Sequence, residues 1–593
     1  MWQKIKYVCR RIREYKKYAI MTPLFMIGEA GVECCIPFVM SLLLDKIDDL
    51  KDIRSLWPYL VALIGMAIIS ITCGILGGIT AAKASTGFAK NLRHDLYVKL
   101  QSYSFANIDK FSSSSLVTRM TTDIANTQMA FQMCIRIVVR APLMFLFSVI
   151  MSFISGGLLA LIFVGLIPVV VIGLLIIIKK ALPVFRRVFK RYDLLNQSVE
   201  ENVSGIRVVK SFVREDYEKT KFNNASFSIS LEFIKAEKIV AWNNPLMNTA
   251  IHLSNLLVLS IGSWLILTTS NYNPTSKDYI WGQLSPAQMS TCITYGLQIL
   301  TSLMMISMII VMLVMSIESI KRVAEVLEEV PTIVNPNEPV YEIADGSIDF
   351  DNVDFKYFQN AEKNTLEDIN IHIKSGQFVG ILGATGSGKT SVVNLISRLY
   401  DVNNGSVKVG GVDVKNYDLK VLRDNVSVVL QKNVLFSGTI ASNLKWGNKN
   451  ATNEEMIQAL THAQALEILR GEGEQGLEKK VEQGGANFSG GQKQRLCIAR
   501  ALLKKPKILI LDDSTSAVDT KTDRLIRKAL KDDLSDMTKI VIAQRISSIE
   551  EADQIIVMND GHIDAIGTHD DLIKNNKIYQ EVYNTQNKVG GEQ

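Results

Sequence analysis

The sequence has few cysteines and little net charge for its length. Seven cysteines are spread over 593 residues, and no two of them form a CxxC pair. Most lie in apolar stretches, so we interpret them as small buried residues in a reduced compartment rather than as redox or metal-binding groups. The net charge of +6 does not suggest a protein that binds nucleic acid. The composition also excludes the collagen-like, intrinsically disordered and disulfide-rich secreted classes.

Hydrophobic residues are abundant, at 48 % of the chain with a mean hydropathy of +0.16. A membrane part joined to a soluble part fits these values, since charged residues still make up 21 %. Runs long enough to cross a bilayer occur only in the first 320 residues. The uncharged run from Ala141 to Ile178 is too long for one crossing of a core of about 30 Å, so we divide it at Gly156 and Gly157. The six expected spans are residues 18–44, 56–82, 133–155, 158–178, 240–269 and 286–317.

The positions of Lys and Arg predict how the spans are oriented. The N-terminal segment has seven, residues 83–132 have six and residues 179–240 have thirteen, whereas the three intervening loops have four in total. The positive-inside rule therefore places both termini in the cytoplasm, with long helical extensions on that side. Residues 1–17 have apolar positions near helical spacing among basic residues, which predicts an amphipathic helix on the membrane surface; a disordered basic tail is the alternative.

After Ile317 the chain becomes charged and then rich in proline, which predicts a linker over residues 321–345. From about Gly346 short β-rich runs alternate with helical runs, as in an α/β domain, which we place at residues 346–585 with a tail at 586–593. A strand at Gln377–Ile381 precedes a glycine-rich loop and a helix, the arrangement of a phosphate-binding Walker A loop. Its backbone N–H groups would cradle phosphate, Lys389 would reach the β- and γ-phosphates, and Thr390 would hold Mg²⁺. The loop residues are Gly383, Ala384, Thr385, Gly386, Ser387, Gly388, Lys389, Thr390 and Ser391.

Two further motifs support an ATP site. The apolar strand from Ile508 ends in Asp512, as in a Walker B strand whose carboxylate holds Mg²⁺. Between the two Walker motifs, Phe488-Ser489-Gly490-Gly491-Gln492 closely resembles the LSGGQ signature of ABC transporters. The resemblance implies that Tyr357 stacks on adenine, that Gln431 is the Q-loop glutamine with a place beside Mg²⁺, and that Ser516-Ala-Val-Asp519 is the D-loop.

The resemblance extends over the membrane half. Six spans, two long inner loops and a C-terminal nucleotide-binding domain are similar to an ABC exporter half-transporter. It implies an all-α transmembrane domain with cytoplasmic helical extensions followed by an α/β P-loop domain. It also implies coupling helices near Phe105–Phe111 and within Arg207–Glu215, the second of which docks into the partner's nucleotide domain.

Two positions depart from the family pattern. The catalytic glutamate expected after Asp512 is Asp513, whose carboxylate is one methylene shorter. The switch histidine is replaced by Gln544, which donates a hydrogen bond but cannot carry the positive charge of histidine. A harmless variation is one interpretation. The combination of Asp513 and Gln544 instead resembles the pattern in the degenerate subunit of heterodimeric bacterial exporters. We therefore expect slow ATP hydrolysis at this chain's Walker site. Gln483 also replaces the usual X-loop glutamate, with Glu482 beside it, which places the usual contact of that loop with the coupling helices in doubt.

The resemblance implies a second, non-identical half-transporter that supplies the catalytic glutamate and the switch histidine. The signature residues of this chain, Ser489, Gly490, Gly491 and Gln492, would complete the site that the partner's Walker motifs form. Two ATPs would close the nucleotide domains and turn the membrane helices outward, and hydrolysis at the intact site would reopen them. We expect a bacterial plasma-membrane protein embedded in lipid.

The expected substrates are amphipathic small molecules, drug-like or lipid-like. Glu29 and Glu33 lie on one face of the first span and could bind cationic substrates, although structural pairing is the alternative. Met304, Met308 and Met312 repeat at helical spacing in the sixth span and could form an adaptable substrate surface, or simply pack between helices. A low-turnover regulatory subunit and a peptide or lipid exporter remain as alternative functions.

Overall fold

The computed structural model describes residues 2–47, 56–273, 278–280, 284–358, 361–469, 473–514 and 517–590. The chain forms two compact units. The first contains Met1–Gln101 and Ser113–Glu329, and the second contains Ser102–Ser112 and Val330–Gln593. The chain therefore passes between the units three times, and the short segment Ser102–Ser112 groups with the C-terminal unit.

The described part of the first unit is mostly helical and also contains the two short strands β1 (Asn271–Asn273) and β2 (Asp278–Ile280). Its helices are α1 (Trp2–Cys9), α2 (Lys16–Ile47), α3 (Trp57–Gln101), α5 (Ser113–Thr118), α6 (Ile124–Gly156), α7 (Leu161–Ser204), α8 (Ile206–Ser211), α9 (Glu215–Ala241), α10 (Asn243–Thr269) and α11 (Pro286–Glu328). Arg10–Tyr15 and Gly157–Ala160 are 3₁₀ turns, and Arg119–Asp123 is a π-helical turn.

Among the residues that the structure describes, five helical stretches are long and apolar enough to cross a membrane. They are Gln3–Lys46, Trp57–Gln101, Ser113–Val188, Glu215–Thr269 and Pro286–Glu328. The third stretch contains both α6 and α7, which are separated where Gly157 takes a φ of +50°. A positive φ favours glycine, so this residue lets the chain reverse between two spans.

Several helices extend beyond the spans that hydropathy predicts. Helix α6 begins at Ile124 rather than near 133, and Asn126 in its first turn donates a hydrogen bond to Ser319 of α11. Helix α11 continues to Glu328, into the segment that we predicted as a linker. Helix α11 begins with a capping box of Ser285 and Gln288 and with Pro286 in its first turn, all features that favour helix initiation.

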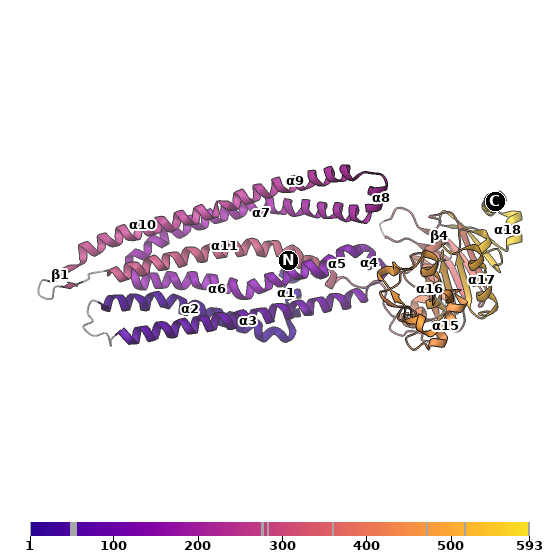
Figure 1. Ribbon diagram of the computed structural model, residues 1–593, viewed down its shortest axis with the longest axis horizontal. Helices are drawn as coiled ribbons and strands as arrows, with labels where there is room; N and C mark the ends of the chain where they lie inside the picture. Colours follow the sequence, from indigo (N-terminus) through magenta and orange to yellow (C-terminus); the bar gives the residue numbers. More distant parts are fainter. Residues whose placement is uncertain are drawn as a thin grey trace. The chain divides into compact units, whose positions relative to one another are not determined.

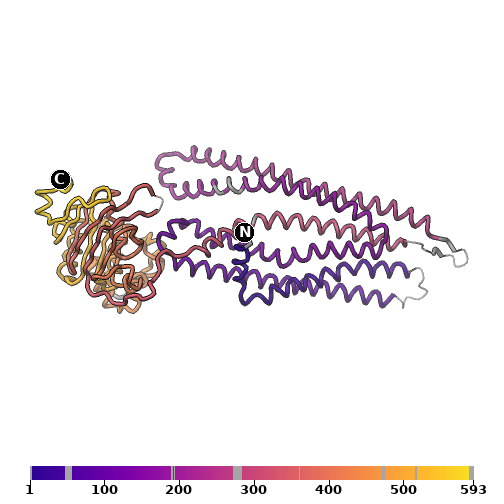
Figure 2. Tube along the Cα trace, turned by 180° about the vertical axis from the view of Figure 1, so that it is seen from behind, coloured from indigo at the N-terminus to yellow at the C-terminus, as the bar shows by residue number. Residues whose placement is uncertain are grey.

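Helices α2, α3, α6 and α11 pack along one another, whereas α7 and α9 lie side by side as a hairpin whose end carries α8 (Figures 1 and 2). Gly77 of α3 packs against the end of the Met26 side chain of α2, which would have to move to admit a Cβ at that position. The α8 end of the hairpin exposes apolar side chains, with Phe212 71 % and Val213 80 % accessible.

The second unit is an α/β domain with two sheets. The six-stranded sheet has the order β14-β13-β5-β12-β11-β8 and is parallel except for β14, and the four-stranded sheet β4-β3-β6-β7 is antiparallel. The strands are β3 (Ile348–Phe355), β4 (Leu366–Ile373), β5 (Phe378–Gly383), β6 (Asn404–Val409), β7 (Val412–Asp413), β8 (Val426–Val429), β11 (Ile508–Asp512), β12 (Thr538–Ile542), β13 (Gln554–Asn559) and β14 (His562–Gly567), with the pair β9 (Gly438–Thr439) and β10 (Lys480–Val481) apart. The predicted fold class, a helical membrane domain followed by an α/β domain, is confirmed.

Nine helices are assigned within the described part of this unit. They are α4 (Phe105–Phe111), α12 (Lys389–Ile396), α13 (Leu419–Asn425), α14 (Ile440–Leu444), α15 (Asn453–His462), α16 (Gly490–Leu502), α17 (Thr520–Asp532), α18 (His569–Asn575) and α19 (Lys577–Gly590). Helix α19 runs through residues that we predicted as a tail. Strands β5, β11 and β12 are central and almost fully buried. Because they pair in parallel, their carboxyl ends lie at one edge of the sheet, where ligands bind in open α/β folds.

Candidate nucleotide-binding site

The glycine-rich loop follows β5 and opens helix α12. Gly383 and Gly388 have φ values of +159° and +97°, and a Cβ on Gly383 would collide with the backbone oxygen of Met558. The loop therefore requires glycine to close against β13. Lys389 folds back into the loop, where its Nζ donates to the carbonyl oxygens of Gly383 (2.8 Å) and Ala384 (2.7 Å). Burial lowers the pKa of the Lys389 ammonium, and the charges of Asp512 and Asp513 oppose that shift.

The remaining loop residues differ in accessibility. Ala384, Thr385 and Gly386 are exposed, while Ser387 and Ser391 are buried. A Cβ on Gly386 would meet nothing within 4 Å. The exposed tip leaves the backbone N–H groups open to an anion at the start of α12, where the helix dipole favours negative charge.

Asp512 and Thr390 meet beside the loop. The Thr390 hydroxyl donates to Asp512 Oδ1 at 3.2 Å, and Asp512 is only 2 % exposed at the end of β11. Burial raises the pKa of Asp512, while the hydrogen bond from Thr390 lowers it. A carboxylate beside a hydroxyl is the oxygen donor set that Mg²⁺ prefers, so these two residues fit the ion that accompanies ATP.

Asp513 is held by both predicted glutamines. Its Oδ2 accepts hydrogen bonds from Gln544 Nε2 (3.0 Å) and Gln431 Nε2 (3.3 Å). Asp513 has a φ of +48°, a conformation that is strained for a residue with a Cβ and is often found at functional sites. The structure thus brings together the two positions that depart from the family pattern, with the Q-loop glutamine as the third member.

Residues outside the motifs support this cluster. The backbone oxygen of Gln544 accepts from Gln586 Nε2 (2.8 Å), and Gln586 Oε1 accepts from the backbone N–H of Ile546 (2.9 Å). Gln586 lies on α19, within the segment that we predicted as a tail, so that prediction missed a residue that positions Gln544. No sequence motif marks it.

Tyr357 lies in an aromatic cluster after β3. Its ring meets Phe355 at 4.8 Å and Tyr400 at 4.9 Å between centroids, and its hydroxyl lies 2.9 Å from Ser391 Oγ. Tyr400 in turn donates to Asp109 Oδ2 of α4 at 2.6 Å. The sequence analysis missed Tyr400 and Asp109, which no motif identifies. Tyr357 is therefore tied to the loop helix on one side and to α4 on the other.

The signature residues form the N-terminus of α16. The Ser489 hydroxyl accepts from the backbone N–H of Gln492 (3.3 Å), and Gln492 Oε1 accepts from the backbone N–H of Ser489 (2.9 Å), which makes a capping box. Gly490 and Gly491 pack against Ala517, whose backbone oxygen would lie 2.8 Å from a Cβ on Gly491. These glycines leave the helix N-terminus exposed, which suits a phosphate.

The D-loop and the X-loop flank the signature. Asp519 is the N-cap of α17 and accepts from the backbone N–H of Thr522 (2.9 Å), and this hydrogen bond lowers the pKa of Asp519. Ser516, which begins the predicted D-loop, lies outside the described residues. Glu482 and Gln483 are both exposed, and the backbone N–H of Glu482 donates to Asn487 Oδ1 at 3.1 Å.

A groove in the same unit lies beside the Q-loop. It encloses a cavity of about 440 Å³ and is lined by Phe105 of α4, by β8 and by the stacked rings of Phe436 and Trp446, whose centroids are 4.5 Å apart. Both rings are exposed, at 48 % and 65 %. The lining also includes the cationic side chains of Arg423, Lys432, Arg500 and Lys504. The exposed aromatic rings of this groove suit a helix with aromatic side chains of its own.

The two membrane acids pair within the first unit. Arg140 Nη2 of α6 lies 2.7 Å from Glu33 Oε2 and 3.4 Å from Glu29 Oε1. The sequence analysis did not identify Arg140 as their partner. These two ion pairs are the structural pairing that the sequence analysis gave as the alternative, and a role of the acids in substrate binding stays a prediction.

The three methionines differ in their surroundings. Met304 packs partly against a core formed by α7, α10 and α11, whereas Met308 is 65 % exposed and Met312 is half-buried. Met308 therefore keeps the accessibility that a substrate surface requires, and Met304 serves in part as helix packing.

Comparisons with known proteins agree with this architecture. Residues 19–303 match the family model described as ABC transporter transmembrane region, and residues 366–516 match the one described as ABC transporter. The uncharacterized ABC transporter ATP-binding protein YfiB of Bacillus subtilis is 31 % identical over 575 residues, which cover 97 % of each chain. An ATP-dependent lipid A-core flippase of Pseudomonas fluorescens is 32 % identical over 91 % of this chain and 87 % of its own. The structure of a bacterial Atm1-family ABC exporter with ATP bound has a similar fold, with a TM-score of 0.80, 22 % identity and coverage of 97 % and 98 %.

Proposed function

This chain belongs to the ABC transporter family, as a half-transporter with an exporter fold, and we propose that it is the degenerate-site subunit of a heterodimeric exporter. The observation that carries the proposal is the cluster of Asp513, Gln544 and Gln431 beside a complete phosphate loop. Asp513 replaces the longer glutamate, and Gln544 replaces a histidine. A positioned general base contributes on the order of 10²–10⁴ in rate, so ATP at this Walker site is expected to be bound and hydrolysed slowly.

The chain's own residues then have distinct roles. Lys389 exchanges its contacts with Gly383 and Ala384 for the phosphates of ATP, and Tyr357 stacks on the adenine. Thr390 and Asp512 hold Mg²⁺, which neutralises phosphate charge when bound. The exposed N-terminus of α16, with Ser489, Gly490, Gly491 and Gln492, covers the γ-phosphate at the partner's Walker site.

A partner chain also explains the α7–α9 hairpin. Its α8 end exposes Phe212 and Val213, and apolar side chains at such high exposure mark a protein interface. We propose that α8 docks into the partner's nucleotide domain and that the partner's equivalent helix enters the groove beside Phe436 and Trp446. Closure of the two nucleotide domains on ATP would then move the membrane helices from inward- to outward-facing.

The proposed substrates are amphipathic small molecules taken from the cytoplasm or the inner leaflet of a bacterial plasma membrane, with both termini of the chain in the cytoplasm. The similarity to a lipid A-core flippase supports a lipid-like substrate. A regulatory subunit with little turnover is the second candidate, because an impaired site could act through ATP binding alone. Transport assays on the reconstituted complex separate them: ATP-dependent uptake of an amphipathic dye into inside-out vesicles supports export, and its absence with intact ATP binding supports regulation.

Replacing Tyr357 with Ala is expected to weaken ATP binding at this site roughly tenfold, since base–aromatic stacking contributes about 1–3 kcal/mol. Tyr357→Phe keeps the ring and loses only the contact with Ser391, so its affinity should stay within about twofold. Titration with a fluorescent ATP analogue measures both. Tyr341→Ala, at an exposed tyrosine of the same domain, is the control. Wild-type affinity in Tyr357→Ala would contradict the assignment.

Neutralising the membrane triad tests whether its acids bind cations. The Glu29→Gln, Glu33→Gln, Arg140→Gln variant leaves no unpaired charge in the bilayer. If the triad is structural, export of a cationic dye stays within about twofold of wild type, relative to a neutral dye measured in the same vesicles. A selective loss of cationic-dye export would instead assign the acids to the substrate site.

A further inference from the structure

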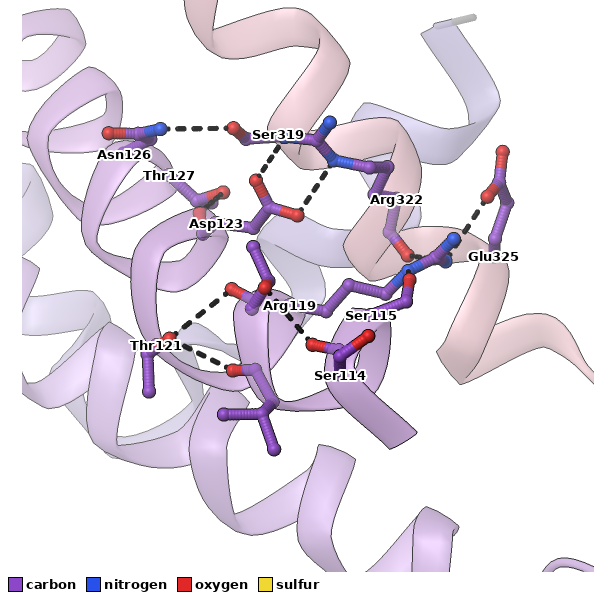
Figure 3. Close-up of polar contacts among 12 residues, drawn as sticks. Ser114, Ser115, Arg119, Thr121, Asp123, Asn126, Thr127, Ser319, Arg322 and Glu325 are labelled. Carbon is purple, nitrogen blue, oxygen red and sulfur yellow. Dashed lines mark hydrogen bonds and ion pairs between the residues drawn. The ribbon is translucent and has the colours of Figure 1, made fainter. Parts of the chain in front are cut away.

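A polar cluster joins two helices of the membrane unit near the points where the chain leaves it. Asp123 is fully buried and accepts two hydrogen bonds from Arg322 of α11, from Nη2 to Oδ1 at 2.6 Å and from Nε to Oδ2 at 2.8 Å (Figure 3). This two-point arrangement fixes both the distance and the orientation of the two side chains. Asp123 lies at the end of the π-helical turn Arg119–Asp123, and single π turns within helices are frequent at functional sites.

Two further contacts complete the cluster. Arg119 Nη1 donates to the backbone oxygen of Arg322 (2.7 Å) and lies 3.2 Å from Glu325 Oε2 (Figure 3). Asn126 Nδ2 donates to the buried Ser319 Oγ at 3.2 Å. The turn before α6 is therefore bound to α11 over Ser319–Glu325. We name Arg119, Asp123, Asn126, Ser319, Arg322 and Glu325 the membrane-side clamp.

The chain segments that continue from this cluster, α4 and the residues after Glu329, are also hydrogen-bonded to each other within the second unit. Asn107 of α4 donates from Nδ2 to the backbone oxygen of Val330 (3.0 Å), and its Oδ1 accepts from the backbone N–H of Thr332 (3.1 Å). Ser104 Oγ lies 2.5 Å from Thr332 Oγ1. The chain crosses between the units after Ser112 and after Glu329. The two chain segments that cross at these points are therefore hydrogen-bonded to each other within each unit.

The first of these crossings is conformationally strained. Ser112 has a φ of +57°, a value that costs free energy for any residue with a Cβ. The strained backbone at Ser112 leaves that residue few alternative angles, which suits a crossing that transmits movement between α4 and α6.

We propose that the membrane-side clamp, centred on Asp123 and Arg322, is a coupling joint. It joins the chain segment that enters the membrane unit at Ser113 to the segment that leaves it at Glu329. A movement of α4 and Val330 therefore reaches α6 and α11 together. Asp123 and Arg322 are positioning residues that touch neither ATP nor substrate. The role follows from the exporter architecture and holds whether the transporter is a heterodimer or a homodimer.

The test compares hydrogen–deuterium exchange of the complete transporter in lipid vesicles, with ATP and vanadate and without nucleotide. The decisive variant is Asp123→Asn with Arg322→Gln, which breaks the pair and leaves no unpaired buried charge. We expect the nucleotide-induced change within β5 and α12 to stay within twofold of wild type. The changes within α6 and α11 should fall at least fivefold, with a melting temperature close to that of wild type.

Two variants accompany it. Lys321→Gln removes the neighbouring exposed pair of Lys321 with Glu318 (2.7 Å) on the same helix and should leave every change as in wild type. Arg322→Lys keeps the charge and loses the two-point geometry, so the changes in α6 and α11 should fall at least threefold. If the double variant does not fold, Arg322→Lys alone tests whether the clamp couples α4 to α6 and α11. Wild-type changes in α6 and α11 in either variant would overturn the proposal.

Discussion

Restoring glutamate and histidine at positions 513 and 544 is expected to convert this chain's Walker site into a fast ATPase. The Asp513→Glu, Gln544→His variant should raise hydrolysis at that site by roughly 10²-fold or more, because it supplies both a carboxylate of full reach and a charged switch residue. Steady-state phosphate release from the complex measures the gain, after the partner's catalytic glutamate is changed to glutamine to silence the other site.

Two controls make this result specific. Asp513→Asn, which cannot act as a base, should leave the slow rate within about twofold, since the native aspartate is expected to contribute little. Each single restoration should give less than the double variant, because Asp513 and Gln544 share one hydrogen bond and act as a unit. A double variant that hydrolyses no faster than the native chain would contradict the interpretation of a degenerate site.

Changing Gly490 to Asp should reduce the rate of ATP hydrolysis at the partner's site by about 10²-fold or more. The substitution places a carboxylate at the N-terminus of α16, where the γ-phosphate of the partner's ATP is proposed to bind, and repels it. The fold should tolerate the change, because a Cβ on Gly490 meets Ala517 at an ordinary 3.5 Å and an acidic residue stabilises a helix N-terminus. ATPase activity and the melting temperature of the complex are measured together.

The two sites of the proposed heterodimer are expected to respond differently to substitutions in this chain. Lys389→Ala weakens ATP binding at the slow Walker site but leaves the partner's Walker motifs and this chain's signature residues intact, so it should reduce total hydrolysis less than Gly490→Asp does. Asn450→Asp adds the same charge in an exposed loop and should change neither activity nor stability. Equal losses in Lys389→Ala and Gly490→Asp would mean that the two sites hydrolyse alike.

Local sequence patterns predicted the parts of the molecule that depend on neighbouring residues. The Walker loop was predictable because only glycine fits at Gly383 and Gly388, and the chain reversal was predictable at Gly156 and Gly157. The continuation of α11 to Glu328 follows from good helix formers beyond the apolar run, a signal that hydropathy alone does not register.

Long-range pairing could not be predicted in the same way. Arg140 meets Glu33 across 107 positions and Arg322 meets Asp123 across 199, and both depend on how whole helices rotate against one another. Tyr400 and Gln586 likewise act through contacts that tertiary folding creates. Because such residues carry no motif, the sequence identified the Walker and signature segments but not the side chains that contact them from distant parts of the chain.

The central claim is that this chain works beside a different half-transporter. The most direct test is to purify the tagged chain from its own host and to measure the native mass and subunit composition of the complex. The account predicts a one-to-one complex with a second half-transporter that carries glutamate after its Walker B aspartate and histidine at its switch position. A homodimer of twice 66.0 kDa would contradict it, because both sites would then contain Asp513 and Gln544.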